Sequence, residues 1–179
     1  RGKNATIYNF LSSKNVSVSM RTLVATFRLG KNIIHGSFLT EAHVVLRTNM
    51  GRFFNVSLLT NVLNANGWSW RFARGSCAKP GNHVAFVLGP HSKKQCDNLW
   101  VEVIMSSMIV HTQEWKIIVR ALPVYNRIDG PRHRLDIQIS QRVSDDRFEV
   151  FPHGLIGQSF DRDSKPRRGK VDHYPPRSA

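Results

Sequence analysis

The chain has 179 residues, and 41% of them are hydrophobic, so it can bury one core and does not belong to the disordered class. It contains no apolar run long enough to span a bilayer as a helix. The net charge of +14 favours an anionic partner, although dispersed basic residues are also typical of a solvated surface. It begins at Arg1 without a methionine or a leader, so either a leader has already been removed or, as we expect, the chain is a piece of a longer secreted protein.

Residues 16–29 alternate apolar and polar side chains, but the alternation changes phase midway. A β-bulge or a strand break produces this pattern. A turn is expected at 30–32 and a second break at Gly36. Clean alternation over 41–48 and 52–60, on either side of Asn49-Met50-Gly51, predicts a hairpin.

The second half of the chain repeats the strand pattern. Trp68, Trp70 and Phe72 alternate with polar residues and predict a strand with an aromatic core face. Further strands are expected in the sequence ranges 84–88, 99–110, 114–120 and 132–140. About eight short strands without an amphipathic helix indicate an all-β fold, an antiparallel β-sandwich or open barrel. We expect one domain over 1–160 and a polar tail over 161–179.

Two cysteines, Cys77 and Cys96, enclose a Gly/Pro/Lys-rich stretch. We predict a disulfide between them, and the alternative is a pair of buried thiols in a reducing compartment. Asn4, Asn15 and Asn55 each begin an Asn-x-Ser/Thr acceptor sequence for N-glycosylation. Together these features favour the secretory pathway and an extracellular or cell-surface location.

The most distinctive segment is Pro152-His153-Gly154-Leu155-Ile156-Gly157-Gln158, which follows a strand containing Arg134-Leu135-Asp136. The two glycines predict a tight turn beneath Leu155 and Ile156, at positive φ or in close backbone contact, with His153 hydrogen-bonded through its backbone.

This segment resembles the C-terminal domain of inter-alpha-trypsin inhibitor heavy chains. It is similar, more distantly, to von Willebrand factor type D domains and to secreted protist proteins of the same type. The resemblance covers about 45 residues, from Gly130 to Tyr174. It implies an extracellular β domain that assembles or scaffolds within a larger chain. The chain departs from type D domains in having Ile156 where they have Cys, and in lacking their Gly-Asp-Pro-His opening motif.

The same resemblance implies calcium ligands after the motif, and Asp161, Asp163 and Asp172 are the matching positions. The alternative, which we favour, is that these aspartates pair with neighbouring cations. No other cofactor is expected. The eight histidines lack metal-ligand spacing, so structural or surface roles are the better interpretation.

The sequence contains no nucleophile elbow, phosphate loop or metalloprotease motif. We therefore expect a non-enzymatic structural and interaction module, which binds protein chains of an extracellular assembly, or an anionic glycan, by charge and shape. The densest cationic cluster comprises Lys165, Arg167, Arg168 and Lys170. The alternative is a basic β domain that binds nucleic acid through the aromatic strand around Trp70.

Overall fold

The computed structural model describes residues 5–79, 82–142, 152–160 and 171–172. Over these residues the chain is almost entirely antiparallel β-structure, as the sequence predicted. Two short 3-10 turns, η1 (Thr60–Val62) and η3 (Gly157–Phe160), are the helical elements of this part. No helix in it is long and apolar enough to cross a membrane. The strands are β1 (Ile7–Ser13), β2 (Val16–Leu29), β3 (Asn32–Arg47), β4 (Phe53–Leu59), β5 (Ala73–Lys79), β6 (Asn82–Leu88), β7 (Ser92–Cys96), β8 (Leu99–Ile104), β9 (Ser107–His111), β10 (Trp115–Pro123), β11 (His133–Gln141) and β12 (Val171–Asp172).

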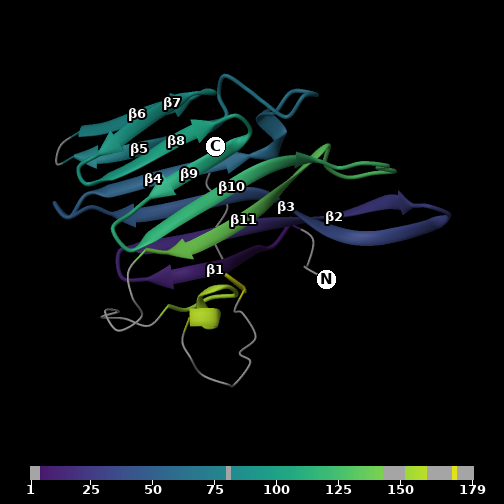
Figure 1. The fold of residues 1–179 in the computed structure, drawn as a ribbon, viewed down its shortest axis with the longest axis horizontal. Helices are drawn as coiled ribbons and strands as arrows, with labels where there is room; N and C mark the ends of the chain where they lie inside the picture. Colours follow the sequence, from purple (N-terminus) through teal and green to yellow (C-terminus); the bar gives the residue numbers. More distant parts are fainter. Residues whose placement is uncertain (1–4, 80–81, 143–151, 161–170, 173–179) are drawn as a thin grey trace.

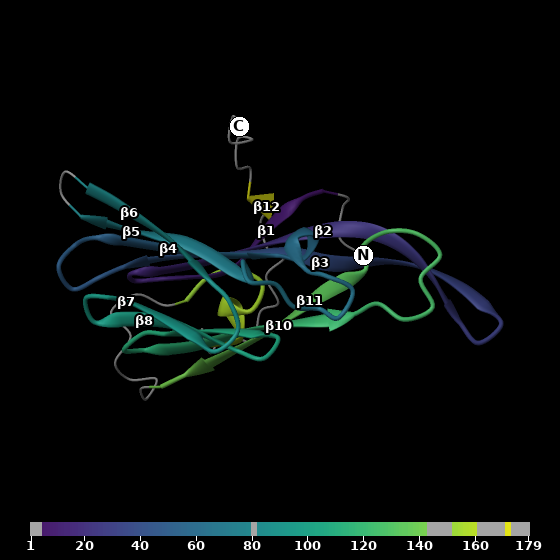
Figure 2. The ribbon, with the colours of Figure 1, turned by 90° about the horizontal axis from the view of Figure 1, so that it is seen from above.

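The strands form one 12-stranded sheet that folds over into two layers (Figures 1 and 2). The first layer holds β12, β1, β2, β3, β4, β5 and β6, and the second holds β11, β10, β9, β8 and β7 in that order. The two layers part at β3. Along one side this strand pairs with β2 over its whole length, and along the other it meets first β11 and then β4.

A β-bulge marks the place where the layers diverge. Arg21 pairs with Glu41 and Thr22 pairs with Leu39, so Thr40 is the extra residue on β3. Leu39 also pairs with Leu135 of β11, whereas β4 begins to pair at Glu41. Because a bulge increases local twist, it lets one strand contribute to both layers. The β-bulge, one of the two explanations for the phase change in residues 16–29, is confirmed. Its extra residue lies on β3, the partner strand, and not on β2.

The core lies between the layers and follows the alternation of the strands. Phe54, Val56 and Leu58 of β4 in the first layer and Ile117 and Val119 of β10 in the second are buried in the same core cluster. Residues between them in sequence point outward, as the period of two requires. Among the described residues the largest buried side chains are Trp115, Phe54 and Phe72.

The segment 152–160 covers the opening between the layers beside β1. Its backbone bonds to β1, since Leu155 N donates to Asn9 O at 3.0 Å and Ile156 N donates to Phe10 O at 2.8 Å. The Phe160 ring meets Trp115 edge to face, with the centroids 5.2 Å apart. A segment near the end of the chain is therefore packed against the first strand and the core.

Three expectations about the strands were wrong. Gly36 does not break the chain, because β3 continues through it and residue 36 pairs with Ala25. Residues 68–72 form a loop rather than a strand. Strands β5 and β7 were missed because ARGSCAK and SKKQC are too polar to show apolar alternation.

Candidate functional site

Cys77 and Cys96 form a disulfide, as predicted, with an S–S distance of 2.01 Å and Cα atoms 5.9 Å apart. The cysteines lie on strands, one on β5 of the first layer and the other at the end of β7 in the second. Both are almost fully buried. No backbone ladder joins β6 to β7 in the described part of the sheet. The disulfide therefore closes the side of the sandwich that lies opposite the β3–β11 junction.

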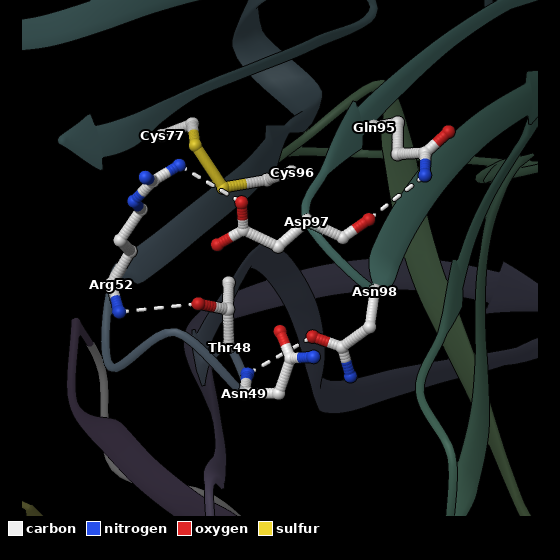
Figure 3. The surroundings of a disulfide bond; sticks show 8 residues. All are labelled: Thr48, Asn49, Arg52, Cys77, Gln95, Cys96, Asp97 and Asn98. Carbon is white, nitrogen blue, oxygen red and sulfur yellow. Dashed lines mark hydrogen bonds and ion pairs between the residues drawn. A yellow bond between two sulfur atoms is a disulfide. The ribbon is translucent and has the colours of Figure 1, made fainter.

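A small hollow of about 140 Å³ lies beside this disulfide. Arg52 Nη1 donates to Asp97 Oδ1 at 2.9 Å, and Gln95 Nε2 donates to the Asp97 carbonyl at 2.8 Å (Figure 3). Asp97 Oδ2 is buried and accepts no hydrogen bond from the described residues. The hollow has room for a small polar group only, and its lining residues are Arg52, Cys77, Val84, Lys94, Gln95, Cys96 and Asp97.

The same corner ties two turns together. Asn49 N donates to Asn98 Oδ1 at 3.0 Å, which links the β3–β4 turn to the β7–β8 turn (Figure 3). Lys94 lies on the edge strand β7, with its ammonium 6.0 Å from the centre of the Phe86 ring. A charge carried on an edge strand disfavours pairing with another chain. These contacts favour a structural role for the corner.

A second cluster lies on the outer face of the first layer, where β2, β3 and β4 run side by side. The His43 ring bridges a hydroxyl and a carboxylate: Nδ1 is 2.9 Å from Ser57 Oγ, and Nε2 is 3.2 Å from Glu41 Oε2. Arg21 Nη1 donates to Glu41 Oε1 at 2.7 Å. The hydrogen bond from His43, followed by the bond and charge of Arg21, holds the pKa of Glu41 below its usual value against the opposing effect of burial.

Sequence reasoning missed this cluster, although a usable signal was present. The predicted hairpin around residues 49–51 pairs Arg47 with Phe53, and the same register places His43 opposite Ser57. A hydroxyl, an imidazole and a carboxylate in a hydrogen-bonded row can activate a serine, provided that substrate and oxyanion donors are also placed. Here the row lies on a sheet face, and the hollow described above is built from other residues.

The outer face of the second layer carries another cluster of interacting polar and aromatic side chains. His111 Nε2 is 2.8 Å from Glu102 Oε1, and its ring stacks on Trp100 with the centroids 4.7 Å apart. The Lys93 ammonium lies 5.0 Å from the centre of the Trp100 ring. These are cross-strand contacts between neighbouring strands, of the kind that stabilise a sheet.

The predicted turn at 152–158 is present, and its two glycines differ in the reason for which they fit. His153 is bonded through its backbone to Ser12, with N···O distances of 2.7 and 2.8 Å. Gly154 has a φ of +98°, so its positive φ is as expected. Gly157 does not have a positive φ. It is restricted by space instead, because a Cβ there would lie 3.2 Å from the Pro152 carbonyl carbon.

The two sequons within the described residues differ in accessibility. Asn15 is exposed in the β1–β2 turn with a φ of +64°. Asn55 lies on the outer face of β4 between buried Phe54 and Val56, but it is only half-exposed and its Oδ1 is buried. The glycosylation acceptor Asn4 lies outside the described residues.

Several other predicted site residues also lie outside the described part of the chain. They are the calcium candidates Asp161 and Asp163 and the cationic cluster Lys165, Arg167, Arg168 and Lys170. The backbone of Asp172 belongs to β12 and pairs with Ile7. In the described residues no group of three or more His, Cys, Asp or Glu side chains gathers at metal-binding distance.

The aromatic residues 68–72 do not form the expected core face. Phe72 is fully buried, whereas Trp70 is 75% exposed. Trp68 is half-buried and meets Trp70 edge to face at 5.5 Å. The loop holds this arrangement because Asn64 Oδ1 accepts from Trp68 N at 3.2 Å.

His133, at the start of β11, is a buried polar residue that the sequence did not single out. Its ring lies 3.4 Å from where a Cβ on Gly67 would be, so the loop before Trp68 packs directly on it. Burial lowers the pKa of His133, the nearby Arg132 charge lowers it further, and a hydrogen bond to the Ala65 backbone partly opposes them. Its role is to join this loop to the core.

Comparison of the chain with models of protein families, with curated proteins and with solved structures finds no match.

Proposed function

We propose that this chain is a non-enzymatic structural and interaction module of a larger secreted or cell-surface protein, which binds an anionic partner by charge and shape. The observation that carries the proposal is an imbalance of charge at the surface. Five carboxylates in the described residues are already bonded inside the molecule, namely Glu41, Asp97, Glu102, Asp129 and Asp136.

Many cations have no such partner. Exposed arginines and lysines occur on both layers and in the connecting loops, without a carboxylate at ion-pair distance within the described part of the chain. They are Arg28, Lys31, Arg47, Arg71, Arg74, Lys93, Arg120 and Arg132. A surface of this kind attracts anions over a range of about 8 Å at physiological salt. Acidic proteins and sulfated glycans are suitable partners.

The disulfide supports the extracellular part of the proposal. Disulfides persist in oxidising compartments and are rare in the cytosol, and this one joins the two layers of the fold. The exposed acceptor Asn15 is compatible with the same route. The resemblance to inter-alpha-trypsin inhibitor heavy chains and type D domains belongs to this proposal as well. For Asp161, Asp163 and Asp172 we still favour pairing with neighbouring cations over the calcium site that the resemblance implies.

One observation favours the alternative of a nucleic-acid-binding domain. Trp70 is exposed and precedes the exposed Arg71, and an exposed ring beside a cation is the arrangement on which single-stranded bases stack. Replacing Trp70 by Ala would then weaken oligonucleotide binding by about 1–3 kcal/mol, and would leave sulfated-glycan binding unchanged.

The experiment that tests the proposal uses protein secreted from a eukaryotic host. Its intact mass, before and after deglycosylation and reduction, reports glycans and the disulfide. Binding to heparin and to single-stranded DNA is then measured as salt is raised.

We expect glycans, an intact disulfide and salt-sensitive heparin binding that weakens when Lys165, Arg167, Arg168 and Lys170 are neutralised. Retention of full heparin affinity in that variant would remove the tail from the proposed site. Failure of the unaltered protein to bind either polyanion at low salt would overturn the electrostatic part.

A further inference from the structure

The hairpin of β2 and β3 extends past the rest of the sandwich (Figures 1 and 2). Its outer part lies beyond the stretch that pairs with β4 and β11, and the β10–β11 loop runs alongside it. Arg28 N donates to Asn126 O at 2.8 Å, and Ile128 N donates to Thr26 O at 2.9 Å. Two chain segments, residues 26–35 and 125–128, therefore make up one projecting tip.

This tip exposes large apolar side chains. Leu29 is 64% exposed, Ile33 55%, Tyr125 76% and Ile128 51%. Leu29 pairs with Asn32 and Ile33 pairs with Arg28, so Leu29 and Ile33 lie on opposite faces of the hairpin. An ordinary protein partner would cover one face of such a hairpin. Entry of the tip into an apolar medium would cover the apolar groups on both faces at once.

Three exposed cations lie on the same segments as these apolar side chains. Arg28 and Lys31 are exposed at the turn and have no carboxylate partner in the described part of the chain. Arg127 Nη1 donates to Gly130 O at 2.7 Å and remains exposed. The nearby acid, Asp129, accepts a hydrogen bond from Thr26 N. The tip thus carries exposed apolar groups and three exposed cations on the same short segments.

We propose that this tip docks on a membrane surface rich in anionic lipid. Leu29 and Ile33 enter the boundary between headgroups and acyl chains, Tyr125 lies at the polar interface, and Arg28, Lys31 and Arg127 contact lipid phosphates. Apolar insertion combined with attraction to anionic headgroups is the usual basis of reversible surface binding, and tyrosine is enriched at this depth. The inference shares Arg28 and Lys31 with the charged surface of the proposed function, but its apolar contacts through Leu29 and Ile33 belong to it alone.

The test is co-sedimentation of the full chain with vesicles of phosphatidylcholine mixed with phosphatidylserine, and with vesicles of phosphatidylcholine alone. We expect binding to the anionic vesicles that weakens with salt. Leu29→Ser and Ile33→Ser should each weaken it about tenfold. Arg28→Gln and Lys31→Gln should each weaken it about fivefold. Thermal melting checks that each variant is folded, which is expected because these side chains are exposed.

Matched controls lie at the far end of β3. Met50 is 66% exposed in the β3–β4 turn, so Met50→Ser removes an equally exposed apolar group away from the tip. Arg47→Gln removes an exposed cation of the same region. Both should bind vesicles as the unaltered protein does. A Leu29→Trp variant adds a direct readout, because lipids brominated on their acyl chains should quench it and should leave a Met50→Trp variant unquenched.

Three results would overturn the inference. The first is failure of the unaltered chain to sediment with anionic vesicles at low salt. The second is equal binding by the unaltered chain and the tip variants, which would mean that net charge alone is responsible. The third is loss of self-association in the tip variants, measured by ultracentrifugation, together with absence of vesicle binding, which would assign the tip to contacts between copies. Heparin binding in Leu29→Ser and Ile33→Ser separates this inference from the proposed function, because these two variants keep every cation and should bind heparin as the unaltered protein does.

Discussion

Gly154 lies directly against the backbone of Phe10. A Cβ at position 154 would be 2.8 Å from the Phe10 carbonyl carbon, and φ at this glycine is +98°. The short distance and the positive φ both disfavour any residue with a side chain at position 154. We expect Gly154→Ala to lower the free energy of unfolding by about 1–3 kcal/mol or more, measured by urea denaturation, because the segment that covers the core beside β1 would have to move.

Gly30 provides the control for this prediction. It has a φ of +59°, but a Cβ there would meet nothing within 4 Å. Gly30→Ala reports the cost of positive φ alone, about 1 kcal/mol. Equal destabilisation by the two variants would show that the contact with Phe10 does not matter.

The disulfide should contribute strongly to stability. Cys77 and Cys96 are separated by 19 positions, for which the chain-entropy model gives about 3 kcal/mol. A Cys77→Ala/Cys96→Ala variant should have a lower urea midpoint than the unaltered protein. Reducing agent should lower the midpoint of the unaltered protein and leave that of the variant unchanged. An unaltered protein whose midpoint is insensitive to reduction would contradict the prediction.

Stability should fall on mild acidification because of His133. The folded state holds the pKa of this buried histidine below the ordinary value of 6.5, so the unfolded chain takes up the proton first. The stability that comes from keeping His133 neutral is fully present above pH 6.5, and it is lost progressively as the pH falls towards the lowered pKa of the folded state. Melting temperatures of the unaltered protein and of a His133→Asn variant, compared above and below pH 6.5, should show a smaller pH dependence in the variant. If the melting temperatures of the two proteins change with pH in parallel, a group other than His133 causes the pH dependence.

The row of Ser57, His43 and Glu41 should be unreactive. Its members lie on an open sheet face, and a serine probe such as a fluorophosphonate requires an activated hydroxyl together with oxyanion donors. Mass spectrometry after incubation should find Ser57 unlabelled. Labelling of Ser57 that disappears in a His43→Ala variant would contradict the non-enzymatic proposal and identify a hydrolase-like site.

Glycan occupancy should differ between the two described sequons in secreted protein. Asn15 is exposed in a turn, whereas Asn55 has a buried amide oxygen in the middle of a strand. Asn15→Gln should therefore remove one full glycan mass, and Asn55→Gln should change the mass distribution less. The reverse order would show that Asn55 is modified before β4 pairs with its neighbours.

Local pattern was enough to determine the all-β class and most of its strands. Alternation located β4, β10 and β11, because a half-buried strand must alternate its side chains, and the apolar, β-branched run over 99–110 located β8 and β9. The phase change in residues 16–29 predicted a bulge or a strand break, and the even pair of cysteines, the loop between them and the sequons predicted the disulfide. These signals are local, so no knowledge of the packing is needed to detect them.

Tertiary structure decided which strands that are distant in sequence contact one another and which faces stay exposed. Only packing shows that Thr40 divides β3 between two layers, that Cys77 and Cys96 join those layers, and that β2 and β3 project as an apolar tip. Trp70 is exposed despite its aromatic neighbours, because the loop bonds of Asn64 override the alternation. Alternation specifies which residues share a face of a strand. Whether that face meets another layer or the solvent depends on contacts made by the rest of the chain.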